Sequence, residues 1–203
     1  MPLSIEIQIL NKIKKARRGS LFFVDNFITI GNTKATGKAL ERLVKSGELK
    51  RVAAGIYVRQ EIDPIIGPVT PEIGAIVKAI AKRDRARIVP TGIYALNQLG
   101  LSNQIPLNII YLTDGAARKI KIGKRTITFK KTAPKNLTAI GEISKLVIQA
   151  LRTIGKDKVN EEEIEKIQRL LKKEKLTHLQ NDIRSAPEWI RKIMITVLKE
   201  DIK

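Results

Sequence analysis

Residues 32–59 constrain the fold of this chain more than any other segment, because a helix-length amphipathic stretch runs directly into a hairpin pattern. One side of the stretch is apolar at the helical period, with Ala39, Leu40, Leu43 and Val44. Ser46-Gly47 ends it, since glycine readily takes the left-handed conformation that closes a helix. Two short β runs follow, over 48–52 and 56–59, and Gly55 fits the positive-φ position of the loop between them.

Two more helical segments are predicted upstream of this stretch. Residues 5–16 carry apolar side chains at helical spacing, and residues 21–30 hold three of the four phenylalanines of the chain. Gly31-Asn32 then forms the turn before the third helix. Helices followed by a basic hairpin predict a winged helix-turn-helix over residues 1–60, a motif that lays one helix in the DNA major groove.

The outward side of the helix over 33–45 is basic. Lys34, Lys38, Arg42 and Lys45 share one stripe, and a solubilising surface is the alternative interpretation of it. Polar residues at the start of the helix occupy the place where a recognition helix meets bases. Strand alternation puts Lys50 and Arg51 on opposite faces of the hairpin, so only one of them is expected to face DNA directly. The predicted DNA-binding residues are Asn32, Thr33, Lys34, Thr36, Lys38, Arg42, Lys45, Lys50, Arg51 and Arg59.

The remainder of the chain predicts a second domain after a linker. Residues 61–69 contain two prolines and a glycine and are predicted to be the linker. Residues 70–203 alternate helical segments with strands over 87–90 and 107–113, followed by helices from about residue 140. The predicted fold class is α+β: an N-terminal winged helix-turn-helix, then a mixed α/β domain with a small sheet and a helical C-terminal tail.

A second basic surface is predicted on a hairpin that turns at Gly123-Lys124. Strand alternation places apolar residues on one face of the hairpin and lysine and threonine on the other. The charged residues of this second face are Lys119, Lys121 and Lys130. An exposed sheet edge kept soluble by lysine would show the same pattern.

Charge and composition favour a polyanionic or acidic partner. Lys and Arg number 39 against 20 Asp and Glu, and the excess falls mainly within residues 1–137. The absence of cysteine excludes disulfides and thiolate metal sites. No apolar run approaches the roughly 20 residues of a membrane span, and the start MPLSIEIQIL is not typical of a signal peptide. We therefore expect a cytoplasmic protein with no membrane contact.

Catalytic chemistry finds little support in the sequence. His178 is the only histidine, so a Ser-His-Asp arrangement or a histidine metal cluster is not expected. No phosphate-binding loop is present, and Glu161-Glu162-Glu163 suits the first turn of a helix. The prediction is a binding protein that is not an enzyme and has no cofactor, no metal and no catalytic residues.

Two motifs in order resemble the AbiEi-type antitoxins of type IV toxin–antitoxin systems. The wing of that family has the form R-x-x-x-G-x-Y, matched here by Arg51, Gly55 and Tyr57. A later G-L-(S/T)-x-Q-x-P stretch is matched by Gly100, Leu101, Ser102, Gln104 and Pro106. The resemblance covers roughly residues 4–135 and does not extend to the helices from residue 142 onward.

The resemblance implies a two-part function. The N-terminal domain would bind inverted repeats in the double-stranded DNA of its own operator and repress the operon. Because a monomer would read only a half-site, we also expect a homodimer on DNA. The rest of the chain would oppose a nucleotidyltransferase-type toxin encoded by the neighbouring gene. The residues leave two alternatives open, an RNA-binding module that uses the basic hairpin and a protein-interaction module that uses the helical tail.

Overall fold

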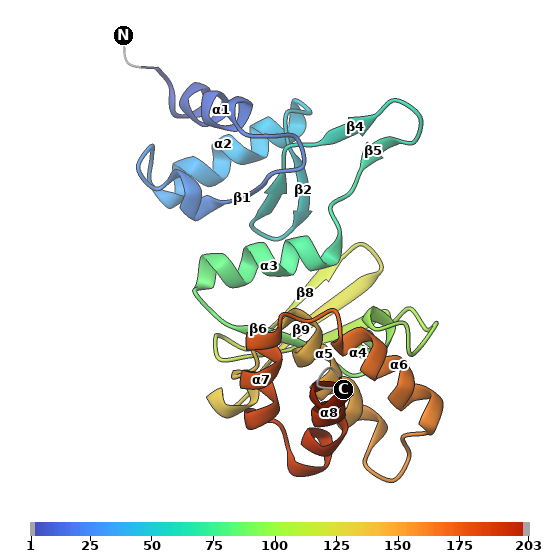
Figure 1. Cartoon of the computed structure of the whole chain (residues 1–203). Helices are drawn as coiled ribbons and strands as arrows, with labels where there is room; N and C mark the ends of the chain where they lie inside the picture. Colours follow the sequence, from blue (N-terminus) through green and yellow to red (C-terminus); the bar gives the residue numbers. More distant parts are fainter. Residues whose placement is uncertain (1–2, 201–203) are drawn as a thin grey trace. The chain divides into compact units, whose positions relative to one another are not determined.

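A computed structural model describes residues 3–200 of the chain and the side chains of residues 3–198. It divides into two compact units, Met1–Lys82 and Arg83–Lys203 (Figure 1). Residues 1–2 and 201–203, at the ends of the predicted domains, lie outside the described residues. Helices and small sheets occur in both units, so the α+β class is confirmed.

Unit 1 begins with α1 (Ile5–Lys15), β1 (Leu21–Phe23), the short 3-10 helix η1 (Val24–Phe27) and α2 (Thr33–Lys45). β2 (Lys50–Ala53) and β3 (Ile56–Val58) follow. The helix predicted over 21–30 was wrong for its first part, since Leu21–Phe23 is extended and pairs with β3. The Asn26 side chain accepts the Phe23 N–H at 2.7 Å, which starts the 3-10 turn only after the strand.

The three strands form one antiparallel sheet in the order β1-β3-β2, so β3 is central. Tyr57 of β3 and Phe22 of β1 are paired across the sheet and lie in the same hydrophobic core as both helices. That core is made of Ile9, Ile13, Phe22, Phe27, Ala39, Leu40, Leu43, Leu49 and Tyr57. Unit 1 therefore has a core of its own, built from residues between α1 and β3.

The segment predicted to be a linker forms a hairpin instead. β4 (Glu61–Asp63) and β5 (Gly67–Val69) pair antiparallel, and α3 (Ile73–Asp84) follows. One Asp63 carboxylate oxygen accepts the N–H groups of Ile65 and Ile66, at 2.8 and 3.0 Å. Together with Gly67 at φ +74° these bonds fix the turn. Its two isoleucines are 93% and 75% exposed.

Unit 2 contains a four-stranded sheet in the order β6-β7-β9-β8. Its strands are β6 (Ile88–Thr91), β7 (Asn108–Thr113), β8 (Arg118–Ile122) and β9 (Arg125–Lys131), with α4 (Ile93–Gln98) after β6 and the 3-10 helix η2 (Pro134–Leu137) after β9. β7 and β9 are parallel, and the other neighbours are antiparallel. The predicted two-residue turn at Gly123-Lys124 is confirmed, because Ile122 pairs with Arg125 and Gly123 has φ +57°.

The predicted helical tail supplies the hydrophobic core of unit 2. Its helices are α5 (Glu142–Ile154), α6 (Glu161–Leu171), α7 (Leu176–Ser185) and α8 (Glu188–Glu200). They bury one cluster against Leu99, with Val147, Ile148, Ala150, Leu151, Ile167, Leu171, Leu179, Ile183, Ala186, Ile190, Met194 and Val197. The capping box predicted for Asn160 and Glu163 is present at the start of α6. Among the described residues, no helix combines the length and apolarity needed to span a bilayer.

Two carboxylates occupy the N-terminus of α5. Asp182 accepts the N–H groups of Ile140 and Gly141 at 2.9 and 2.8 Å, and Glu174 accepts those of Ile143 and Ser144 at 2.7 and 3.1 Å. The N–H groups of Gly141, Ile143 and Ser144 are among those that a helix start leaves without partners. A side chain at position 141 would place its Cβ 2.5 Å from a Glu174 carboxylate oxygen, so a larger residue there would displace the capping carboxylate.

The Glu174→Gln variant tests this cap. Burial alone would raise the pKa of the Glu174 carboxyl, but the N–H groups of Ser144, Ile143 and Lys175, together with the charge of His178, hold the pKa below its ordinary value of 4.5. Removing the charge should lower the free energy of unfolding at neutral pH by about 1.5–3 kcal/mol. Because the folded-state pKa is lowered, this stabilisation is present above about pH 4.5 and is lost as the pH falls through the lowered value. Urea unfolding between pH 3 and 7 would measure the difference in the free energy of unfolding between variant and wild type, which should become smaller as the pH falls.

Glu165→Gln provides the control, because Glu165 is exposed on α6 and has no hydrogen bond or ion pair among the described residues. That variant should change the free energy of unfolding by less than about 0.5 kcal/mol. Equal destabilisation by the two variants would contradict the capping role.

Candidate nucleic-acid interface

Helix α2 separates a buried side from a basic side. The Asn32 side chain accepts the Ala35 N–H at 2.9 Å and so caps the helix. Thr36, Ala39, Leu40 and Leu43 are buried. At 3.6 residues per turn, Lys34, Lys38 and Lys45 fall within an arc of about 40° on the opposite side, which also carries one acid, Glu41. All four side chains are exposed. No acidic partner of these lysines occurs among the described side chains.

Two residues of the predicted set do not belong to this basic side. Thr36 is fully buried, and its hydroxyl donates to the Gly31 carbonyl oxygen at 3.2 Å. The Arg42 side chain is 55% exposed but forms an ion pair with Glu6 of α1. Arg42 lies about 80° around the helix from Lys34, on the flank toward α1. The prediction that Thr36 contacts bases was therefore wrong, and Arg42 is held by an internal partner.

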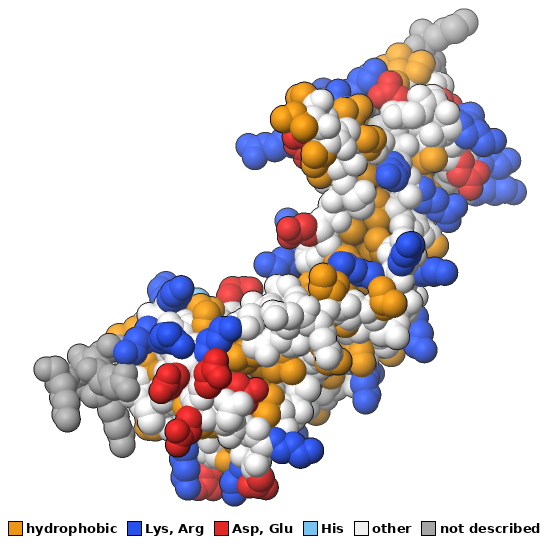
Figure 2. All heavy atoms as spheres, turned by 90° about the vertical axis from the view of Figure 1, so that its right-hand side faces the viewer, with side chains coloured by type: hydrophobic (Ala, Val, Ile, Leu, Met, Phe, Trp, Pro, Cys, Tyr) orange, Lys and Arg blue, Asp and Glu red, His pale blue; other side chains and the backbone are white. Residues whose placement is uncertain are grey.

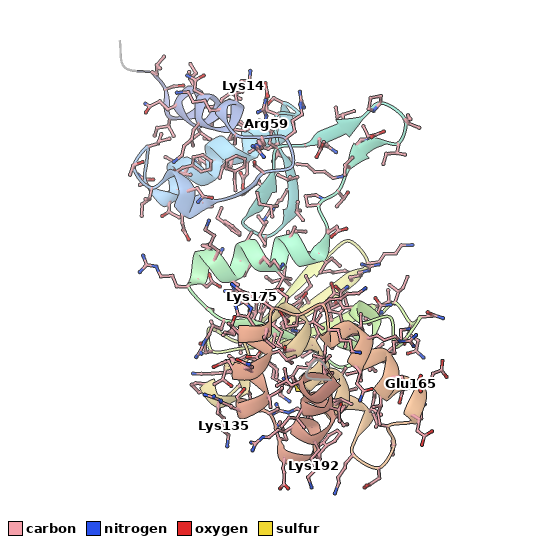
Figure 3. The ribbon with its side chains drawn as sticks, viewed as in Figure 1. Lys14, Arg59, Lys135, Glu165, Lys175 and Lys192 are labelled. Atoms are coloured by element: carbon pink, nitrogen blue, oxygen red, sulfur yellow. The ribbon has the colours of Figure 1, made fainter. Side chains whose placement is uncertain are left out.

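Arg59 is also held internally. Its guanidinium donates to the carbonyl oxygen of Lys14 at 2.8 Å and to that of Ala16, at the C-terminal end of α1 (Figure 3). These are carbonyl groups that a helix end leaves unsatisfied. The structure therefore corrects the prediction that Arg59 contacts DNA, since this side chain ties the end of β3 to α1.

The β2–β3 hairpin confirms the predicted alternation of its basic residues. Lys50 pairs with Val58 and Arg51 pairs with Tyr57, so the two side chains leave opposite faces of the sheet. Tyr57 belongs to the core that contains α1 and α2, which places Arg51 on the helix side of the sheet. Both basic side chains are exposed, as is Thr33 at the first position of α2.

The second predicted surface also has the expected geometry. Lys119 and Lys121 of β8 face Thr128 and Thr126 of β9 in the ladder, and all three predicted lysines are exposed. Lys130 lies on the same face, two residues beyond Thr128. The two predicted surfaces belong to different units of the chain.

A small hollow in unit 2 contains cations that sequence reasoning missed. Lys135, Lys145 and Arg152 line it together with Val89 and Gln149. The Lys145 ammonium forms an ion pair with Glu142 at 2.5 Å, and burial lowers the pKa of the Arg152 guanidinium. These residues come from η2 and from successive turns of α5, so only their tertiary placement brings them together.

The described residues contain no group of three or more His, Cys, Asp or Glu side chains able to hold a metal ion. His178 lies 3.8 Å from the Glu174 carboxylate, which already caps α5. Figure 2 shows Lys and Arg spread over the visible face, with most acidic side chains gathered over the helical part of unit 2. The strongest candidate sites on the described residues are therefore the exposed basic surfaces of α2 and of the β8–β9 hairpin.

Comparisons with known proteins place the chain in a family. A family model described as "Family of unknown function (DUF6088)" matches residues 8–179. The chain belongs to this family. The comparison with curated proteins gave no match. A crystal structure of the RV2827C protein from Mycobacterium tuberculosis has a TM-score of 0.44 and 11% sequence identity, over 97% of this chain and 81% of that one. Family membership by itself assigns no activity to the chain.

The Arg59→Ala variant separates structural from nucleic-acid roles. Loss of the guanidinium leaves two helix-end carbonyl groups without their donor, so the free energy of unfolding should fall by about 1.5–3 kcal/mol. Urea unfolding measures this loss. Arg51→Ala is the matched control on the exposed part of the hairpin and should change stability by no more than about 0.5 kcal/mol. Unchanged stability of Arg59→Ala together with weakened DNA binding would restore Arg59 to the interface.

Proposed function

We propose that unit 1 is a winged helix-turn-helix that binds double-stranded DNA, with α2 as its recognition helix and the β2–β3 hairpin as its wing. The order α1, β1, η1, α2, β2, β3 and the sheet order β1-β3-β2 support this assignment. The observation that carries it is the exposed side of α2, where Lys34, Lys38 and Lys45 lack acidic partners among the described residues. Thr33 at the start of α2 and one of the two exposed wing residues, Lys50 or Arg51, which leave opposite faces of the sheet, complete the proposed interface.

We further propose that the chain is an antitoxin that represses its own operon. The resemblance to AbiEi-type antitoxins supports this part, through the wing motif and the stretch at residues 100–106. The operator would consist of inverted repeats read by two copies, since one winged helix covers only a half-site. The remaining part of the role is to oppose a nucleotidyltransferase-type toxin encoded by the neighbouring gene. A cytoplasmic location and a lack of enzymatic activity follow from this role.

DNA binding is tested with the duplex upstream of the protein's own gene and a scrambled duplex of equal length. We expect a preference of about a thousandfold or more for the natural sequence. The triple variant Lys34→Ala, Lys38→Ala, Lys45→Ala should lose most of this affinity. Its slope of log K against log salt should become shallower by about 0.9 for each phosphate that the variant no longer neutralises. Fluorescence anisotropy at several salt concentrations measures both quantities.

A matched triple variant, Lys156→Ala, Lys158→Ala, Lys173→Ala, removes equal charge from exposed positions of unit 2. It should keep the preference for the natural duplex. Equal affinity of the wild type for natural and scrambled duplexes would contradict operator recognition, and equal losses in the two triple variants would contradict the role of α2.

Repression and toxin antagonism should be separable. In cells that carry the neighbouring gene, the triple variant in α2 should lose repression of a promoter reporter. It should still relieve the growth arrest that the neighbouring gene causes, because the substituted side chains belong to DNA binding alone. If the wild-type chain does not relieve the growth arrest, the antitoxin role is contradicted. The DNA-binding proposal would be unaffected by that result.

A further inference from the structure

The lysine and threonine side chains of β8 and β9 belong to one continuous face of the unit 2 sheet. The ladder pairs Lys121 with Thr126 and Lys119 with Thr128, and Lys130 pairs with Leu112 of β7. Directly paired residues project from the same face of a sheet. Lysine side chains therefore flank two threonine hydroxyls across neighbouring strands. We define this set, Lys119, Lys121, Thr126, Thr128 and Lys130, as the Lys/Thr face.

The charge on this part of the chain is almost entirely positive. Residues 107–141 contain eight Lys and Arg and one acid, Asp114. Asp114 accepts the Arg87 N–H and Nε–H groups at 2.7 and 2.8 Å, so a cation already neutralises it. Among the described side chains, no carboxylate pairs with the three lysines of the Lys/Thr face. The cost of gathering these charges is therefore not offset within unit 2, and a polyanion would offset it.

Only one half of this sheet face is covered. Val89 of β6 pairs with Leu112 of β7, and Leu112 pairs with Lys130 of β9. Val89 therefore lies on the same side of the sheet as the Lys/Thr face. It lines the small hollow with Ile148 and Gln149, so α5 covers the β6 end. Toward β9 and β8 the face opens to solvent, with Ile110 39% exposed. Lys135, Lys145 and Arg152 line the hollow at this covered edge, and Lys145 is paired there with Glu142.

The geometry of this sheet face favours some kinds of nucleic acid over others. β9 is paired with β7 over residues 126–131 and with β8 over residues 125–129, so the hairpin is not a free ribbon that could enter a major groove. Tyr111 and Phe129 pair with each other and lie on the opposite, buried face, which leaves the Lys/Thr face without rings for base stacking. A flat surface of ammonium and hydroxyl groups matches the wide, shallow minor groove of A-form RNA, which displays phosphates and 2′-hydroxyls.

We propose that the Lys/Thr face of unit 2 binds double-stranded RNA. The lysines contact phosphates on both sides of the minor groove, and the Thr126 and Thr128 hydroxyls contact ribose 2′-hydroxyls. Neither hydroxyl makes a hydrogen bond to another group among the described residues, so both are free to do so. This activity is independent of the proposed operator binding, which uses side chains of unit 1.

The test uses the full chain and two duplexes of one arbitrary sequence, about 20 base pairs of RNA and of DNA, which exceeds the roughly 16 base pairs that a double-stranded RNA-binding domain spans. Fluorescence anisotropy should show the RNA duplex bound about tenfold or more tighter than the DNA duplex. The Lys119→Gln, Lys121→Gln, Lys130→Gln variant should weaken RNA binding about tenfold or more. The α2 triple variant should leave RNA affinity within about twofold while it abolishes operator binding. Equal affinity of the wild type for the two duplexes would overturn the proposal.

The hydroxyl contacts are tested with Thr126→Val, Thr128→Val, which keeps side-chain shape and suits a strand. RNA affinity should fall about fivefold or more, while DNA affinity stays unchanged. Thermal unfolding of each variant checks that the sheet is intact. An equal loss for RNA and DNA in the lysine variant, or no loss in either variant, would show that this face does not read RNA. An operator preference without RNA binding would overturn this inference alone, whereas RNA binding without an operator preference would overturn only the proposed function.

Discussion

The central position of β3 organises the sheet and helices of residues 5–59. Its three residues pair with β1 on one side and with β2 on the other. Tyr57 enters the core beneath both helices, and Arg59, directly after the strand, donates to the carbonyl groups at the end of α1. The exposed lysines of α2 are therefore held in place by interactions between residues more than thirty positions apart. Rigid support of this kind is what a surface needs to present charges at fixed spacing.

The helical periodicity around residues 33–45 predicted α2 well because one side of that helix is buried and the other is not. The same logic failed for Leu21–Phe23, where a short apolar run fits either a helix or a buried strand and only the pairing with β3 decides. Thr36 and Arg59 were misassigned for a related reason. A polar side chain at a promising position can be satisfied internally, by the Gly31 carbonyl oxygen or by the end of α1, and sequence alone does not show such partners. The linker prediction failed because proline and glycine occur in the turns of hairpins as readily as in flexible segments.

The lysines of α2 and of the Lys/Thr face have no acidic partners among the described residues, whereas the N-terminus of α5 in unit 2 is already occupied. Glu174 and Asp182 bind the N–H groups at the start of α5, so that helix end offers no place for an external phosphate. Under the two proposals, an external polyanion would bind the sheet face or α2 instead. The acidic side chains concentrate instead on the helical part of the chain, where the first turn of α6 alone carries three glutamates.

Each unit has its own hydrophobic core, one built from residues 9–57 and the other from residues 99–197. A protease cut within the helices of unit 2 would remove part of the second core and leave the first complete. If α2 reads an operator, the surviving fragment would still occupy the promoter, but its part of unit 2 would lack a complete core to support it. Such a fragment would compete with the intact protein for the same DNA. Proteolysis would then change the output of the operon without clearing its promoter.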